Sequence, residues 1–215
     1  YSLIYLVVFK VRPIDMSSEA YVIYIFCGLI PLINFSQGLV QGSASLSADS
    51  GVLLNTVFPP ELIPMRESMV AMVTMSCGMV LILIGGFFLG KASIVWFMVP
   101  LVLMLLSIFL IGVTWILSLA NLLIKDVQQL LAYVTIILLI ASPIAYTKSM
   151  LPSALQSLIY FNPLAYYIIS MQDLIVLGTM PDLPIIMGMF VFSFSSLLIG
   201  AYVFGRAKQA FFDYA

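Results

Sequence analysis

One uncharged stretch decides the fold class: residues 92–124 read ASIVWFMVPLVLMLLSIFLIGVTWILSLANLLI. These 33 residues contain no Asp, Glu, Lys or Arg, and a helix needs only about 20 apolar residues to cross the hydrocarbon core of a membrane. Because a charged side chain is costly in hydrocarbon, uncharged runs of this length predict membrane-spanning helices. The stretch therefore predicts an all-α integral membrane protein.

The composition of the whole chain supports the same class. The 215 residues include 8 Lys and Arg and 9 Asp and Glu, so 8% are charged, against a usual share of about 25%. Hydrophobic residues make up 63%, and the mean hydropathy is +1.20. So few charges cannot cover the surface of a water-soluble domain, which excludes a soluble enzyme. The net charge of -1 provides no basic surface for nucleic acid.

Few residues of this chain are suited to catalysis or metal binding. It has no His and two Cys, which excludes histidine general bases and Cys/His zinc sites and argues against a disulfide framework. The acidic pairs Asp15–Glu19 and Glu61–Glu67 lie in polar loops, whereas catalytic carboxylates usually lie in desolvated pockets. We therefore predict no catalytic residue, no metal site and no cofactor in this chain.

The uncharged runs predict one transmembrane domain, residues 1–215, with six spans. The predicted spans are residues 1–9, 20–42, 67–89, 94–120, 128–147 and 184–205. The first is expected to be truncated, because the sequence begins without Met inside an apolar run. Six spans place both ends of the chain on one side of the membrane. Lys and Arg are divided four to four between the two sides, so charge alone does not orient the protein.

Residues 150–178 are as hydrophobic as a span but are broken by Pro152 and Pro163. The segment is predicted to form two short helices, residues 152–160 and 164–177. Each is too short to cross about 30 Å of hydrocarbon, so we expect a re-entrant pair that enters the membrane and returns, placed before the last span. Asn162 is expected to bond backbone groups that Pro163 leaves unpaired. One kinked span is the alternative.

The run Gly85-Gly-Phe-Phe-Leu-Gly-Lys-Ala92 resembles a phosphate-binding P-loop incompletely. A P-loop has Ser or Thr after its Lys and lies between a strand and a helix. Here Ala92 follows the Lys, and the run ends a predicted span. We expect instead that Gly86 and Gly90 form a small-residue face where helices approach closely, and that this chain hydrolyses no nucleotide alone.

The loop after the second predicted span contains Phe58-Pro-Pro-Glu-Leu-Ile-Pro64. Pro60 suits the first turn of a short helix, Glu61 favours a helix N-terminus, and Pro64 is expected to end or kink that helix. A stiff, partly apolar helix loses little entropy when it docks on a partner. The alternative is a loop that packs on the bilayer. The apolar face of the expected docking helix consists of Phe58, Leu62 and Ile63.

This run resembles the Phe-Pro-Arg-Glu-(Ile/Leu)-(Leu/Ile)-Pro loop of ABC-2 type permeases, the membrane subunits of bacterial exporters of O-antigen and teichoic acid. Further resemblances follow in order along the whole chain, at Leu119–Val127, Ser142–Tyr146, Met150–Pro152, Tyr160–Leu164 and Phe204–Asp213. Two departures are clear: Pro60 replaces the loop Arg of the family, and Lys125 replaces the Arg of its Arg-Asp turn. Lys125 keeps the charge but loses the bidentate fork.

The resemblance implies a homodimeric permease in the bacterial inner membrane, with both termini cytosolic. It exports lipid-linked polysaccharide, lies among membrane lipids, and depends on a separate cytosolic ATPase subunit that holds ATP and Mg. Coupling to that ATPase is expected at Phe58, Pro59, Glu61, Leu62, Ile63, Arg66, Lys125 and Asp126. A periplasmic gate and glycan path is expected at Tyr160, Asn162, Pro163, Tyr166, Tyr167 and Gln172.

Alternative interpretations remain open. The tyrosines near the re-entrant pair also fit an interfacial aromatic belt, which requires no sugar. An exporter of a smaller cargo, such as a drug, would share the architecture. An enzyme acting on lipid-linked sugar is a third class, but it would need an acid, base or metal cluster that the sequence does not offer.

Overall fold

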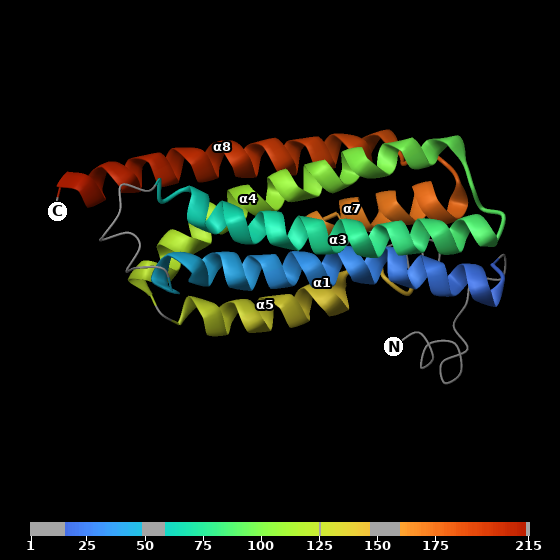
Figure 1. Ribbon diagram of the computed structural model, residues 1–215, viewed down its shortest axis with the longest axis horizontal. Coiled ribbons are helices and arrows are strands. Elements are labelled where there is room, and N and C mark those ends of the chain that lie inside the picture. The colour runs from blue at the N-terminus through green and yellow to red at the C-terminus, as the bar shows by residue number, and fades with distance from the viewer. Residues whose placement is uncertain (1–15, 49–58, 125, 147–159, 214–215) are drawn as a thin grey trace. The chain divides into compact units, whose positions relative to one another are not determined.

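The computed structural model describes residues 16–48, 59–124, 126–146 and 160–213, the last six by their backbone alone. All regular structure in these residues is helical, which confirms the predicted all-α class (Figure 1). The elements are α1 (Ser18–Ala48), α3 (Leu62–Phe88), the 3₁₀ helix η2 (Ile94–Met98), α4 (Val99–Leu123), α5 (Val127–Ala141), α7 (Pro163–Gln172), the π-helical turn η4 (Asp173–Leu177) and α8 (Leu183–Asp213).

Among the described residues, four helical segments are long and apolar enough to cross a membrane: Ser18–Ala48, Leu62–Phe88, Ile94–Leu123 and Leu183–Ala207. They match four of the six predicted spans. The predicted span 128–147 differs, because α5 ends at Ala141. Its 15 residues cover about 22 Å at 1.5 Å per residue, less than the roughly 30 Å of hydrocarbon. The predicted span 1–9 lies outside the described residues, so the six-span topology stays a prediction.

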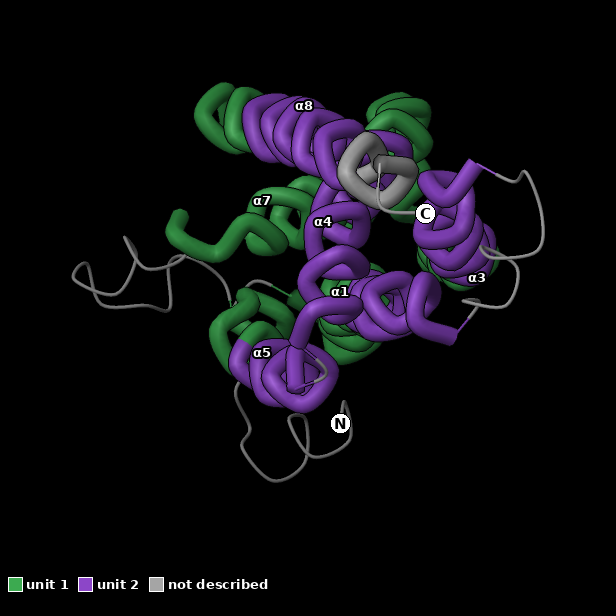
Figure 2. Tube along the Cα trace, turned by 90° about the vertical axis from the view of Figure 1, so that its left-hand side faces the viewer, with its two compact units in different colours: residues 1–33, 75–103, 138–189 green, residues 34–74, 104–137, 190–215 purple. Residues whose placement is uncertain are grey.

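The chain divides into two compact units (Figure 2). Unit 1 comprises residues 1–33, 75–103 and 138–189, and unit 2 comprises residues 34–74, 104–137 and 190–215. Several helices therefore contribute residues to both units.

Helix α7 supplies much of the core of unit 1. Its residues Leu164, Ala165, Tyr167, Ile168 and Met171 are all buried, as are Leu174 and Ile175 of η4. Helix α1 approaches α7 closely at Gly28, where a Cβ atom would lie 3.0 Å from Ile168 and 3.2 Å from Gln172. The absence of a side chain at this glycine therefore permits the contact between the two helices.

Unit 2 is packed through small residues on several helices. At Gly38 of α1, a Cβ atom would lie 2.7 Å from Leu110 of α4 and 2.8 Å from Ala71 of α3. On α8, a Cβ at Gly200 would overlap the backbone of Gly112 on α4. Such close approaches are typical of membrane helices, whose association depends on van der Waals packing and interhelical hydrogen bonds.

The predicted small-residue face at Gly86 and Gly90 is wrong for Gly90, which follows the end of α3. Gly90 has a φ of 69°, its N–H donates to the Phe87 carbonyl at 3.0 Å, and the Lys91 N–H donates to the Gly86 carbonyl at 3.0 Å. These two bonds form a Schellman motif, which closes a helix C-terminus. A phosphate cradle uses the free N–H groups of a helix N-terminus, so this run lacks the geometry of a P-loop. Gly86 does form a close contact, with the Trp96 ring of η2.

Candidate functional site

The predicted coupling segment leads directly into α3. The N–H of Leu62 donates to the Pro59 carbonyl at 3.1 Å, and the N–H of Ile63 donates to the Pro60 carbonyl at 3.2 Å, which forms a turn before the helix. Pro64 lies in the first turn of α3, where backbone N–H groups have no partner within the helix. The expectation of a separate short helix ended by Pro64 is therefore wrong for the described residues. Phe58 lies outside them.

The two described residues of the expected apolar docking face, Leu62 and Ile63, lie in different environments. Leu62 is 41% exposed, whereas Ile63 is 3% exposed. Ile63 packs in a cluster with Leu46 of α1, Leu119 of α4 and Phe204 of α8. Ile63 is thus a packing residue of unit 2 and is not accessible to a docking partner, while Leu62 remains accessible.

Trp115 of α4 contacts the coupling segment, a role that the sequence pattern did not indicate. Its indole N–H donates to the Glu61 carbonyl at 3.0 Å. Its ring lies 6.3 Å from the Phe204 ring, centroid to centroid, and packs against the cluster that contains Ile63. The available signal was a tryptophan within an apolar span, since a buried indole N–H usually finds a hydrogen-bond partner.

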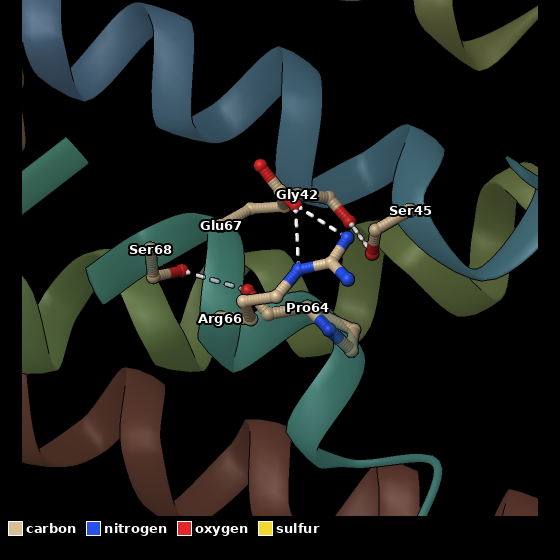
Figure 3. A network of polar contacts seen from close by, with 6 residues as sticks. All are labelled: Gly42, Ser45, Pro64, Arg66, Glu67 and Ser68. Atoms are coloured by element: carbon tan, nitrogen blue, oxygen red, sulfur yellow. Dashed lines mark hydrogen bonds and ion pairs between the residues drawn. The ribbon is translucent and has the colours of Figure 1, made fainter. Parts of the chain in front are cut away.

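The charged residues of this region lie at its surface. Arg66 pairs with the adjacent Glu67, with Nη2 2.7 Å and Nε 3.0 Å from Oε1 (Figure 3). The Arg66 side chain is 60% exposed, and exposed pairs of this kind usually contribute about 0–1 kcal/mol. Asp126 is also exposed and precedes α5. Lys125, its neighbour in the predicted coupling set, lies outside the described residues.

Asn162 begins α7 and joins it to the end of α5. Its Oδ1 accepts the Leu164 N–H at 3.0 Å, and its Nδ2 donates to Ser142 Oγ at 2.9 Å. The side chain is buried, and Pro163 occupies the first position of the helix, where proline is favoured. The prediction that Asn162 bonds backbone beside Pro163 is confirmed. The second predicted half-helix, 164–177, is matched by α7 and η4, while residues 152–159 of the first lie outside the described part.

Gln172 holds the residues that follow α5. Its Nε2 donates to the carbonyls of Pro143 at 3.0 Å and Ile144 at 3.2 Å, and its residue is 1% exposed. The Tyr21 hydroxyl of α1 donates to the Ala145 carbonyl at 2.7 Å. Together with the Asn162 bond to Ser142, these contacts hold each residue of the segment 142–145, which follows α5. Gln172 is therefore engaged in packing and is not accessible to a glycan.

The predicted gate tyrosines fall into two groups. Tyr167 is fully buried, and its hydroxyl donates to the Met189 carbonyl at 3.2 Å. Tyr166 and Tyr160 are both partly exposed, the Tyr166 hydroxyl donates to the Tyr160 carbonyl at 3.0 Å, and their ring centroids are 6.1 Å apart. Of the three predicted gate tyrosines, Tyr160 and Tyr166 therefore offer rings that a sugar could reach, and Tyr167 belongs to the core.

Asp173 follows α7 and is partly buried. Burial, with a smaller contribution from the charge of Asp182, raises the pKa of the Asp173 carboxyl to about 6. Its backbone carbonyl accepts the Thr179 N–H at 3.1 Å, which closes the π-helical turn η4 at Gly178. Burial therefore moves the titration of the Asp173 carboxyl toward neutral pH.

These features define a multi-pass α-helical membrane protein in which Trp115 hydrogen-bonds the turn before α3. No protein-family model matches the chain. It is similar to two proteins of Klebsiella pneumoniae named O-antigen export system permease protein RfbA, at 26% and 25% identity over 213 residues, which cover 98% of this chain and 82% of each relative. It is also 25% identical to a permease of the same name from Myxococcus xanthus, over 87% of this chain and 74% of that protein.

The relatives confirm the resemblance to export permeases that the sequence motifs indicated. Their names describe a transport subunit rather than an enzyme. The similarity extends over nearly the whole chain and does not rest on the Pro59–Pro64 motif alone.

Proposed function

We propose that this chain is the membrane-spanning permease subunit of an ABC exporter that moves lipid-linked polysaccharide, of the O-antigen or teichoic-acid type, across the bacterial inner membrane. The observation that carries the proposal is the similarity over 98% of the chain to proteins named O-antigen export permeases. The four long apolar helices agree with such a subunit. ATP and Mg would bind to a separate cytosolic ATPase, and this chain would hold no cofactor.

The ATPase would contact the start of α3. Pro59 and Leu62 are exposed there, the Arg66 side chain is 60% exposed, and Glu61 lies between them in the turn. Phe58, Lys125 and Asp126 complete the proposed contact. Ile63 would act from inside, because its packing against three other helices holds the turn in place.

The glycan would pass a gate formed near α7, where the partly exposed Tyr160 and Tyr166 offer aromatic faces. Two copies of the chain would line the path, because a polymer needs a wider passage than one subunit offers.

In the proposed six-span topology, both termini are cytosolic and residues 150–178 re-enter the membrane from the periplasmic side. In a cysteine-free background with Cys27 and Cys77 replaced, single cysteines at positions 149 and 179 would then both react with an impermeant maleimide added outside the cell. Labelling at only one of them would show that the segment spans the membrane.

Export itself is tested in a cell that lacks this chain. We expect lipid-linked glycan to accumulate on the cytosolic face of the inner membrane, where it is protected from a glycosidase added to spheroplasts. The wild-type chain restores accessibility, and a chain without the Pro59–Pro64 segment does not, although it still inserts into the membrane. A normal amount of surface glycan in the cell that lacks this chain would refute the proposal.

A further inference from the structure

We infer that Trp115 is a positioning residue for the coupling between this permease and its ATPase, an inference that rests on the proposed function. The indole N–H of Trp115 donates to the Glu61 carbonyl at 3.0 Å across 54 residues of sequence. The acceptor lies in the turn that precedes α3, next to the exposed Leu62. Trp115 therefore contacts the proposed docking segment through a hydrogen bond, and its own side chain is only partly exposed.

The surroundings of Trp115 make this bond a fixed link. The indole ring lies against the Phe204 ring of α8 at 6.3 Å, and it packs on the cluster of Leu46, Ile63, Leu119 and Phe204. These residues belong to α1, α3, α4 and α8, so four helices meet beside the bond. A displacement of the turn at Glu61 would have to move the indole or break its hydrogen bond.

Three of the six residues from Pro59 to Pro64 are prolines, which limits the backbone donors of the segment. Pro59, Pro60 and Pro64 have no backbone N–H, and the two turn bonds are donated by Leu62 and Ile63 to the carbonyls of Pro59 and Pro60. The Glu61 carbonyl accepts its long-range bond from a different helix, α4. We infer that a push from the ATPase on the turn reaches α4 and α8 through this carbonyl and through Ile63.

The chain contains a matched control for this bond. Trp96, the second of its two tryptophans, also has a buried indole N–H, but this group has no hydrogen-bond partner among the described residues. Its ring packs against Gly86 in unit 1. A Trp→Phe substitution keeps an aromatic ring at either site, and it removes a hydrogen bond only at Trp115.

The experiment compares wild type, Trp115→Phe and Trp96→Phe in the purified complex with the ATPase, reconstituted in vesicles with lipid-linked glycan. The measured quantity is glycan translocated per ATP hydrolysed. We expect Trp115→Phe to lower this ratio by about 3- to 10-fold, the range set by the loss of one hydrogen bond, while ATPase association persists. Trp96→Phe keeps the wild-type ratio. An unchanged ratio in Trp115→Phe, or an equal loss in both variants, overturns the inference.

A second measurement uses a variant that keeps Trp115. In Trp96→Phe labelled with 5-fluorotryptophan, Trp115 gives the single ¹⁹F resonance of this chain, and the ATPase is left unlabelled. We expect that resonance to shift when ATP is added to the complex, whereas the Trp96 resonance of Trp115→Phe does not. If the Trp115 resonance does not shift with ATP in a complex that exports glycan, the inference about Trp115 is refuted and the proposed function stands. A wild-type complex that exports no glycan with ATP refutes the proposed function instead.

Discussion

Replacing Gly200 by alanine tests whether the contact between α4 and α8 sets the packing of unit 2. The new Cβ atom would lie 3.0 Å from both the carbonyl carbon and the Cα of Gly112, and closer still to the Gly112 oxygen. All three atoms belong to the backbone of α4, so no flexible side chain can move aside. The two helices must separate.

The size of the effect follows from these distances. Carbon atoms pack best at about 3.5–4.0 Å, so the helices must move apart by roughly 0.5–1 Å, a gap that forfeits a quarter to a half of each contact energy along the interface. The separation also stretches the bond from Ser193 Oγ to the Leu105 carbonyl, now 2.7 Å. Overpacking of this kind costs about 1–3 kcal/mol. We expect Gly200→Ala to destabilise the protein by that amount.

Gly205 on the same helix provides the control, since a Cβ there would meet no atom within 4 Å. Alanine within a helix is more favourable than glycine by about 0.5–1 kcal/mol, so Gly205→Ala is expected to stabilise slightly. The assay is thermal unfolding of both purified variants in the same detergent, followed by the loss of the monodisperse peak. If Gly200→Ala melts at or above the temperature of Gly205→Ala, the close helix contact is not a determinant of stability and the reasoning fails.

Three further outcomes are expected. Asn162→Ala removes both a helix cap and the bond to Ser142 Oγ, so thermal unfolding is expected to show a loss of about 0.5–2 kcal/mol; an unchanged melting temperature would contradict the capping role. Ile63→Ala empties a buried position and is expected to cost about 2–5 kcal/mol, whereas Leu62→Ala keeps the melting temperature and weakens copurification of the ATPase, and the reverse pattern would contradict the assigned directions. Because the pKa of Asp173 is raised to about 6, above the usual value of about 3.9, the folded state holds this proton more tightly than the unfolded state, and stability is expected to fall as the pH rises from about 4 to about 6. Asp173→Asn is expected to flatten that fall, and an equal slope in both proteins would exclude this carboxyl as its source.

The sequence predicted the features that depend on hydrophobicity and backbone chemistry. Four uncharged runs mark the four long helices, because the cost of a charge in hydrocarbon acts on each residue independently of its neighbours. The Asn162-Pro163 pair likewise predicted the start of α7, since the proline removes a donor and the amide can cap the helix. Both signals are local in the sequence, and neither requires knowledge of how the helices pack.

Side-chain direction could not be predicted in the same way. Leu62 is exposed and Ile63 is buried, whereas the predicted short docking helix placed both on one apolar face, because the sequence does not show which other helices pack beside it. The burial of Tyr167 and Gln172, both predicted as gate residues, could not be predicted for a related reason, because it depends on contacts with Met189, Pro143 and Ile144. The end of α5 at Ala141 was missed because the predicted span was bounded by charged residues, although Pro143 signals it by disfavouring a helical conformation at Ser142.

Buried polar side chains show why residue type alone does not separate groups that join helices from groups that could contact a glycan. Membrane helices gain little hydrophobic free energy from mutual contact, so small residues and interhelical hydrogen bonds specify their packing. In unit 2, Ser68 of α3 contacts Thr114 of α4 at 3.0 Å between hydroxyl oxygens, and Asn121 Nδ2 of α4 donates to Ser47 Oγ of α1 at 3.2 Å. Hydroxyls and amides that would suggest sugar contacts in a soluble protein are used here to join helices. A search for glycan contacts is therefore better directed to polar and aromatic groups that remain partly exposed, such as Tyr160 and Tyr166, than to the buried amides of Asn162 and Gln172.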